Sequence, residues 1–303
     1  MVRKYIALVS ILALGLFSLL GCAVSGTVDD SLATPFTGSD SDQVYRAFVR
    51  TRGSLSPEKN VYFYWSGSIY ARASDPQSLV HAGPTRTPIL KFEGFNVARF
   101  ERHESGVRML SREVSFYKDL DGNIIDCWTN PWTKEKNSVL HVYNDPVNFQ
   151  LSAPQHAQMG DYLAWSIDVN LAYPSPLSVQ EYPRYSASDV YRSTEMFDFF
   201  ALKSDLEESK SHPVPVHMTW TRIGQFLPWM QMGQNTGELV YHIQGYKVLE
   251  GFEGLPEALK KTVKARAPSF EFAPDEFQKP NATSWRYFKQ QKDAGQYQDK
   301  CEP

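Results

Sequence analysis

Alternation of apolar and polar residues with a period of two dominates the middle of the chain. One run places Val61, Phe63, Trp65, Gly67 and Ile69 on one face and Tyr62, Tyr64, Ser66, Ser68 and Tyr70 on the other. Similar runs cover residues 162–171 and 214–221. Such alternation is typical of half-buried β-strands, and counting the runs predicts about eight to ten strands. Residues 107–117 and 124–129 flank Asp121-Gly122, a pair that favours a hairpin turn.

Helical spacing is confined to two short segments. Val44, Tyr45, Phe48 and Val49 recur at helical intervals, and residues 256–266 form a second amphipathic segment. Together with 14% aromatic residues, this pattern predicts a mainly β fold. We expect a single antiparallel sheet that closes into a barrel or curves strongly into a half-barrel, with one or two short peripheral helices. A two-sheet sandwich is the alternative.

The N-terminus has the composition of an export signal. Arg3 and Lys4 precede an apolar run of about fifteen residues, shorter than the roughly 20 residues of a spanning helix. The run ends in Leu19-Leu20-Gly21-Cys22, which resembles the bacterial lipobox, where the cysteine is diacylated and becomes the new N-terminus. A plain cleaved signal peptide and an uncleaved anchor are the alternatives. We therefore predict lipidation at Cys22.

This signal sets the expected location and the division of the chain. Residues 1–21 are expected to be the signal peptide, residues 22–41 a flexible tether, and residues 42–303 a single β-rich domain. Ala23 follows the cysteine, which favours export to the outer membrane. The expected location is the bacterial cell envelope, with the lipid in the outer membrane and the domain facing the periplasm.

Charge and cysteine content exclude several classes of function. The net charge of −3 and the isoelectric point near 6.2 lack the basic footprint of nucleic-acid-binding proteins. Apart from Cys22 the chain has only Cys127 and Cys301, so a cysteine-based zinc site is not expected. Their spacing leaves open whether these two cysteines pair. No cofactor is expected either.

Several sequence blocks together resemble one uncharacterised bacterial family, catalogued as domain of unknown function 1838. The blocks are YFYWSGSIYA (62–71), KFEGFNVARF (91–100), LSREVSFYKDLDGNIIDCWTNPWT (110–133), HVYNDPVN (141–148) and FLPWMQMGQNTGELVYHIQGYK (226–247). The likeness covers roughly residues 42–285. It implies one domain and an exported protein, and it brings no established activity, cofactor or catalytic residue.

Polar residues gather in the block HVYNDPVN at the end of a predicted strand. Pro146 biases Asp145 towards an extended conformation, so the block is expected to form a shaped turn. Asn144, Asn148 and Asp145 can stabilise such a turn by bonding to its backbone. Alternatively, His141 acts as a base or hydrogen-bond donor and Asp145 orients it.

Charged residues interrupt two of the predicted strands. Arg112 and Glu113 are adjacent, so they point to opposite faces and one of them faces the interior. Arg222 continues an apolar face that begins at Val214. A buried charge needs a partner or a wet cavity. The alternatives are a purely structural ion pair such as Glu113–Arg222 and an interior pocket in which both groups bind a polar ligand.

Two further features carry possible chemistry. His242, with other histidines and an acid, could bind zinc, but no metal-binding spacing is present and no metal site is predicted. The apolar loop 224–237 contains Trp229 and Met230 between glycines. It is expected to be either a buried plug at one end of the barrel or a mobile mouth that contacts an apolar ligand.

These patterns favour a lipid-anchored protein whose interior binds, or acts on, a small and mostly apolar molecule. A cofactor-independent acid–base enzyme and an envelope structural lipoprotein without a pocket are the alternatives. The catalytic candidates are Glu113, His141, Asp145 and His242. The candidates for ligand binding are Tyr64, Arg112, Asn144, Asn148, Arg222, Trp229 and Met230. The membrane, through the lipid, and a small apolar ligand are the expected partners, and nucleic acid is not.

Overall fold

The computed structural model describes residues 41–75, 77–82, 87–104, 106–151, 155–207 and 212–301. All of these residues belong to one compact unit. The predicted signal peptide, Cys22 and the tether up to residue 40 lie outside the described residues. Among the helices of the described part, none is long and apolar enough to cross a membrane.

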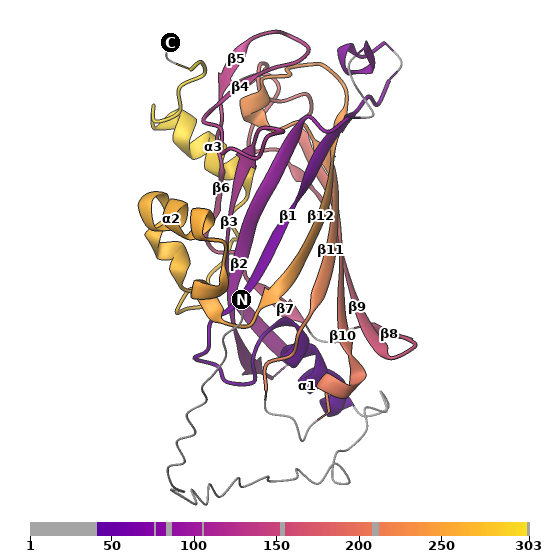
Figure 1. Ribbon diagram of the computed structural model, residues 1–303. Helices are drawn as coiled ribbons and strands as arrows, with labels where there is room; N and C mark the ends of the chain where they lie inside the picture. Colours follow the sequence, from indigo (N-terminus) through magenta and orange to yellow (C-terminus); the bar gives the residue numbers. More distant parts are fainter. Residues whose placement is uncertain are drawn as a thin grey trace, which may run out of the picture. The chain divides into compact units, whose positions relative to one another are not determined.

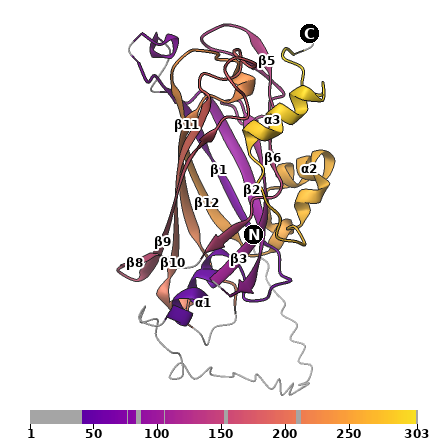
Figure 2. The ribbon, with the colours of Figure 1, turned by 180° about the vertical axis from the view of Figure 1, so that it is seen from behind.

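One antiparallel sheet of ten strands forms the body of this unit (Figures 1 and 2). The strands run in the order β6-β3-β2-β1-β12-β11-β10-β9-β8, and β7 pairs with β3 beside β6. Their bounds are β1 Val61–Arg72, β2 Leu90–His103, β3 Gly106–Lys118, β6 Val142–Asn144, β7 Phe149–Leu151, β8 His156–Met159, β9 Tyr162–Pro174, β10 Val190–Leu202, β11 His217–Gln225 and β12 Glu238–Val248. The mainly β, single-sheet prediction is thus confirmed at this level.

The sheet does not close into a barrel. Across the described residues it ends in β8 on one side and in β6 and β7 on the other, and no pairing joins these edges. The closed-barrel expectation and the two-sheet sandwich are therefore wrong. The alternation of residues along a strand determines which side chains share a face, but it does not specify whether two distant edges pair.

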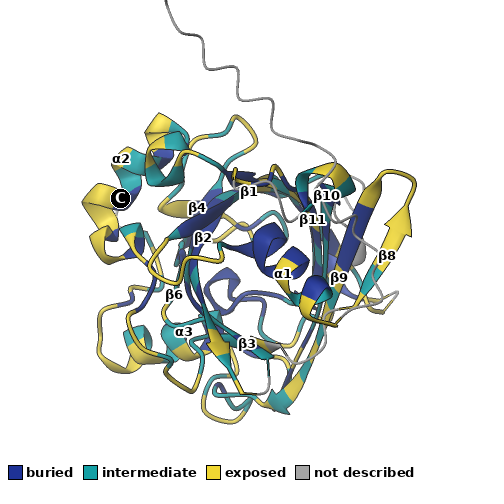
Figure 3. Cartoon of the chain, turned by 90° about the horizontal axis from the view of Figure 1, so that it is seen from below, coloured by how far each residue is buried: buried dark blue, intermediate teal, exposed yellow. Residues whose placement is uncertain are grey.

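Helices and apolar side chains cover both faces of the sheet. On the outer face, α2 (Glu257–Arg266) packs Leu259 and Val263 against a cluster that includes Phe95 and Phe116. On the inner face, α1 (Ser41–Arg52) buries Ala47 and Phe48. Figure 3 shows α1 inside the curve of the sheet, with β2 on one side of it and β10 on the other.

The prediction of one or two peripheral helices is wrong in number and, for α1, in position. Among the described residues there are three α-helices, and the one that sequence periodicity missed is α3 (Ser284–Asp293). Its Trp285 and Phe288 are buried, and the Thr283 side chain accepts a hydrogen bond from the Arg286 amide at its N-terminus. Helix α1 is also largely buried, because its apolar stripe packs against the inner face of the sheet.

Short elements complete the unit. The strands β4 (Cys127–Thr129) and β5 (Lys136–Ser138) form a separate pair, and a disulfide joins Cys127 to Cys301. Gly122 supplies a positive φ to the predicted turn, but only one bridge, Lys118–Ile124, follows it, so the predicted hairpin is incomplete. Five 3-10 helices are η2 Leu79–Ala82, η3 Lys203–Asp205, η4 Pro228–Met230, η5 Gly251–Gly254 and η6 Pro268–Glu271.

Candidate functional site

A cavity of about 500 Å³ lies on the inner side of the sheet. Its walls come from β1, β2, β3, β6 and β7 on one side and from β9, β10 and β11 on the other, while α1 and residues 280–286 complete them. Most of the lining is aromatic or aliphatic, including Phe63, Phe92, Ile167, Phe197 and Trp220. The volume and the apolar lining are those of small-molecule sites in proteins.

Gly94, which has no side chain, allows one aromatic wall of the cavity to form. Gly94 lies between Trp65 on β1 and Ser115 on β3 in the strand register. The Trp65 indole reaches across it and donates to Ser115 Oγ at 3.1 Å. A Cβ at residue 94 would come within 2.2 Å of that oxygen. The glycine therefore makes room for the indole that lines the cavity.

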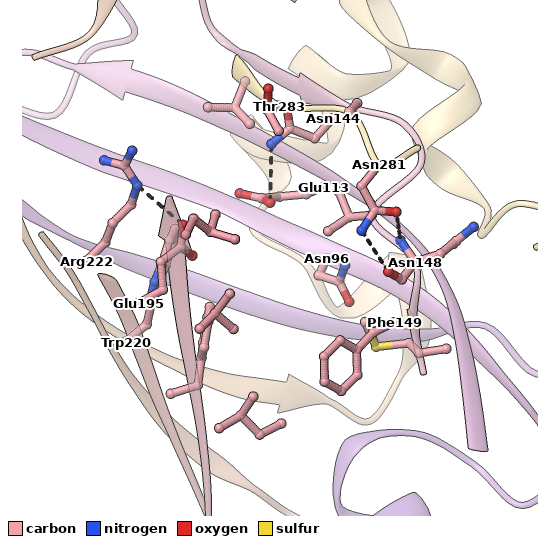
Figure 4. Close-up of a pocket in the computed structure, with 18 of the residues that line it drawn as sticks. Asn96, Glu113, Asn144, Asn148, Phe149, Glu195, Trp220, Arg222, Asn281 and Thr283 are labelled. Atoms are coloured by element: carbon pink, nitrogen blue, oxygen red, sulfur yellow. Dashed lines mark hydrogen bonds and ion pairs between the residues drawn. The ribbon is translucent and has the colours of Figure 1, made fainter. Parts of the chain in front are cut away.

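Glu113 is the centre of a row of polar groups on one wall. It pairs in register with Asn96 on β2 and with Asn144 on β6, so the three residues lie side by side. In Figure 4 the Asn144 side chain points towards the Glu113 carboxylate, and its amide nitrogen donates to Glu113 Oε2 at 3.5 Å. Asn96 Oδ1 and Asn144 Oδ1 are buried and accept no hydrogen bond from any described residue. This wall therefore offers hydrogen-bond acceptors to a molecule in the cavity.

A second polar row lies on the opposite wall. Arg222 on β11 is in register with Glu195 on β10 and with Tyr241 on β12. Its Nε is 3.4 Å from Glu195 Oε1 (Figure 4), its Nη2 donates to the Tyr191 hydroxyl at 3.1 Å, and its guanidinium lies 5.0 Å from the Tyr241 ring centre. Arg222 Nη1 is buried without a partner among the described residues, so one strong donor remains available.

The two rows influence each other electrostatically. Burial, and then the nearby Glu195 carboxylate, raise the pKa of Glu113 to about 7, although Asn144 and Arg222 act in the opposite direction. Burial also raises the pKa of Glu195, against the effect of Arg222. Glu113 can therefore hold a proton near neutral pH and donate it, whereas an exposed glutamate would be ionised.

We expect Glu113→Gln to remove part of the pH dependence of stability. The folded protein keeps the Glu113 proton up to about pH 7, whereas the unfolded chain loses it near pH 4.5, so the free energy of unfolding falls as the pH rises between these values. A shift of about 2.5 pH units corresponds to a contribution of roughly 3 kcal/mol from this residue to the fall. Urea unfolding at pH 4.5, 6 and 7.5 measures it.

The matched control is Glu257→Gln, because Glu257 is an exposed carboxylate whose side chain is 87% accessible. This variant should keep the pH profile of the native protein. If Glu113→Gln also leaves the profile unchanged, Glu113 titrates like an exposed residue and its placement in the cavity is wrong.

His141 and Asp145 are held apart from the cavity. His141 is buried, its Nδ1 accepts from the Tyr117 amide at 3.1 Å, and its Nε2 lies 3.3 Å from Asp126 Oδ1. Burial lowers the pKa of His141 to about 4, so the ring is neutral. The carboxylate beside His141 is thus that of Asp126, and Asp145 instead pairs with Arg112 at 2.8 Å. The predicted orientation of His141 by Asp145 is therefore wrong.

Arg112, Tyr64 and His242 lie on the outer side of the sheet. Arg112 donates to the carbonyl oxygens of Ser269 and Phe272, so Glu113 is the member of the Arg112–Glu113 pair that faces the interior. Tyr64 donates to Glu93 at 2.7 Å, next to the outer cluster under α2. His242 is exposed on β12. None of the three lines the cavity.

The loop 224–237 packs as a plug rather than standing open. Trp229 is 2% exposed and Met230 is 0% exposed, and the Trp229 ring contacts those of Tyr117 and Trp128. The Met230 carbonyl accepts hydrogen bonds from the side chains of Asn130 and Asn137, at 3.0 Å each. Neither Trp229 nor Met230 lines the cavity, although Leu227 of the same loop does.

Asn148 lines the cavity but its polar atoms are already engaged. Its backbone N–H donates to Asn281 Oδ1 at 2.9 Å, and its backbone carbonyl accepts from the Asn281 side chain at 2.8 Å. Its side-chain oxygen accepts from the Ser111 backbone N–H, and its side-chain nitrogen donates to the Gln278 carbonyl. Asn148 thus ties the segment before α3 to the edge of the sheet, where that segment closes one side of the cavity (Figure 4).

Three of the site residues predicted from the sequence line the cavity and have a side-chain group that is unpaired or titratable. They are Glu113, Asn144 and Arg222. The predicted Glu113–Arg222 ion pair is replaced by Glu195–Arg222. Sequence analysis missed Glu195, although a signal was present. It lies at alternate positions with Tyr191, Phe197 and Phe199, so it is a carboxylate on a largely aromatic strand face.

The described part of the chain contains no preformed metal-binding site. No group of three or more His, Cys, Asp or Glu residues is arranged there to hold a metal ion. Both carboxylates of the cavity interact with Arg222: Glu195 pairs with it, and its charge acts to lower the pKa of Glu113.

Comparison with known protein families identifies one match. The family model described as protein of unknown function (DUF1838) matches residues 58–292, and the chain belongs to this family. The comparison with curated proteins and the comparison with solved structures gave no match.

Proposed function

We propose that this member of the family is a lipid-anchored protein of the bacterial envelope that binds a small, mostly apolar molecule inside a strongly curved half-barrel. The main support is the cavity of about 500 Å³, in which aromatic walls surround buried polar atoms without protein partners. Arg222 Nη1 can donate to a ligand oxygen, and Asn144 Oδ1 can accept from a hydroxyl or amine. A filled core, as an envelope structural lipoprotein would need, leaves no such space.

Native mass spectrometry of the full-length protein, extracted from bacterial membranes, tests this proposal. The protein is expected to carry a small apolar molecule. Val169→Trp should remove it, because Val169 lines the cavity beside Glu195 and the larger side chain fills the space. His242→Ala, on the outer face, is the control and should keep the molecule. A native protein that carries no ligand and takes up none from a lipid extract would favour the structural role.

A second candidate function is acid–base catalysis on the bound molecule, centred on Glu113. The observation that favours it is a buried carboxyl group with a pKa of about 7 beside a second carboxylate. Such a group can transfer a proton at neutral pH. If it does so, the retained molecule should acquire deuterium in D₂O with the native protein and not with Glu113→Gln, while both proteins bind it. Equal exchange in both proteins would exclude this role.

Anchoring is tested at Cys22. Cys22→Ser should release the protein from membranes or leave its signal uncleaved, because serine has no thiol to acylate. Membrane fractionation and intact-mass analysis measure the outcome. A mature N-terminus at another residue, without an acyl mass, would contradict lipidation.

A further inference from the structure

Arg52 is a buried cation at the end of the cavity that α1 occupies. It is the last residue of α1, is 9% exposed, and lines the cavity. Its guanidinium carbon lies 4.6 Å from the ring centre of Phe63 and 4.7 Å from that of Phe199. Its Nη2 contacts the sulfur of Met109 at 3.4 Å. The two rings hold the guanidinium in place through cation–π contact.

Within the described part of the chain, this cation has no counter-ion. No described carboxylate influences the charge of Arg52, and its Nη1 is buried without a hydrogen-bond partner among the described residues. Burial alone lowers its pKa to about 10, and Arg52 remains charged at neutral pH. Arg222, the other buried arginine of the cavity, differs because Glu195 neutralises it. An unpaired buried charge is costly, and contact with rings and with a helix C-terminus offsets only part of that cost.

Two strands carry both a residue that contacts Arg52 and a polar residue of the cavity. Met109, which contacts Arg52, precedes Glu113 by four residues on β3. Phe199, which also contacts Arg52, follows Glu195 by four residues on β10. Four residues of a β-strand span roughly 13 Å. On these two strands, the residue that contacts Arg52 and the polar residue are therefore separated by the same length of backbone, and the lining between them includes the apolar side chains of Ile167, Phe197 and Trp220.

We infer that the ligand is a long-chain carboxylate, whose anionic head accepts hydrogen bonds from Arg52 and whose hydrocarbon chain runs along the aromatic walls. A hydroxyl or oxo group further along the chain reaches Glu113, Asn144 and Arg222. A guanidinium with free N–H groups recognises carboxylates well, and it discriminates against a neutral or cationic head of the same length. This inference rests on the proposed function.

The test compares heads of different charge on one chain. Full-length protein in lipid nanodiscs is titrated with tritiated decanoate in a scintillation proximity assay, with empty nanodiscs as the blank, and decanol and decylamine compete. We expect decanoate to bind at least tenfold more tightly than decanol, and decylamine to bind most weakly. Arg52→Gln should remove the preference for decanoate over decanol, and Arg52→Lys should keep part of it.

The matched control is Arg192→Gln, since Arg192 lies on β10 but is exposed to solvent and is not part of the cavity lining. This variant should keep the preference for decanoate. Retention of the preference in Arg52→Gln would overturn the inference. So would equal weakening of decanoate and decanol binding, because Arg52 would then act only in packing. If Arg52→Gln fails to fold, the native ratio and that of Arg52→Lys still decide between these outcomes.

The outcome also separates this inference from the proposed function. If the native protein binds decanol as tightly as decanoate, the cavity binds apolar molecules but Arg52 does not select an anion. If neither compound binds and extracted protein carries no molecule, the proposed function itself fails.

The position of the second polar group is tested with 10-hydroxydecanoate. It should bind more tightly than decanoate to the native protein, and Asn144→Leu should remove this gain; no gain in the native protein would overturn that part.

Discussion

Arg222→Met is expected to lower the free energy of unfolding by about 3–5 kcal/mol. The substitution leaves the buried Glu195 carboxylate without its ion pair and removes the donor to the Tyr191 hydroxyl. Glu195 can reduce the cost only by holding a proton, so the loss should be larger at pH 8 than at pH 5. Urea unfolding followed by circular dichroism measures both values.

Two variants test whether burial of the pair causes this effect. The double variant Glu195→Leu/Arg222→Met should recover most of the lost stability, because replacing both members of a buried ion pair by apolar groups is often neutral. Arg72→Met breaks an exposed ion pair with Glu238 and should cost less than about 1 kcal/mol. If Arg222→Met costs no more than Arg72→Met, the pair is not desolvated and the polar row is not a buried site.

Met230→Glu is expected to destabilise the protein by more than about 4 kcal/mol or to prevent folding. Met230 is fully buried in the plug, where the side chains of Asn130 and Asn137 hold its backbone carbonyl. A carboxylate there would lose its hydration, because Met230 belongs to the apolar core cluster of the sheet. Thermal and urea unfolding give the magnitude.

The control at this position is Met230→Leu, which conserves volume and should cost less than about 1.5 kcal/mol. A mobile mouth predicts the opposite for Met230→Glu: the protein stays folded with normal stability and only ligand binding weakens. That outcome would show that the 224–237 loop contacts the ligand and that its packed conformation is one of several conformations.

The candidate site could be predicted in part because strand alternation determines which residues share a face. Glu113 was expected to oppose Arg112 across the sheet, and the structure has Glu113 inside and Arg112 outside. The partner of each charge could not be predicted, because it depends on which strands are neighbours. Arg222 lies next to Glu195 only because β11 pairs with β10, and Glu113 lies next to Asn144 only because β6 pairs with β3.

Sequence alone determined the period-two strands, the amphipathic segments that became α1 and α2, and membership of the family, because these follow from local order along the chain. It also indicated that a charge must face the interior. Only the tertiary structure decided that the sheet stays open, that α1 lies within its curve, and that Arg52 enters the cavity without a carboxylate. The physical reason is that these features depend on contacts between segments far apart in sequence, and a local pattern specifies a face but not what covers it.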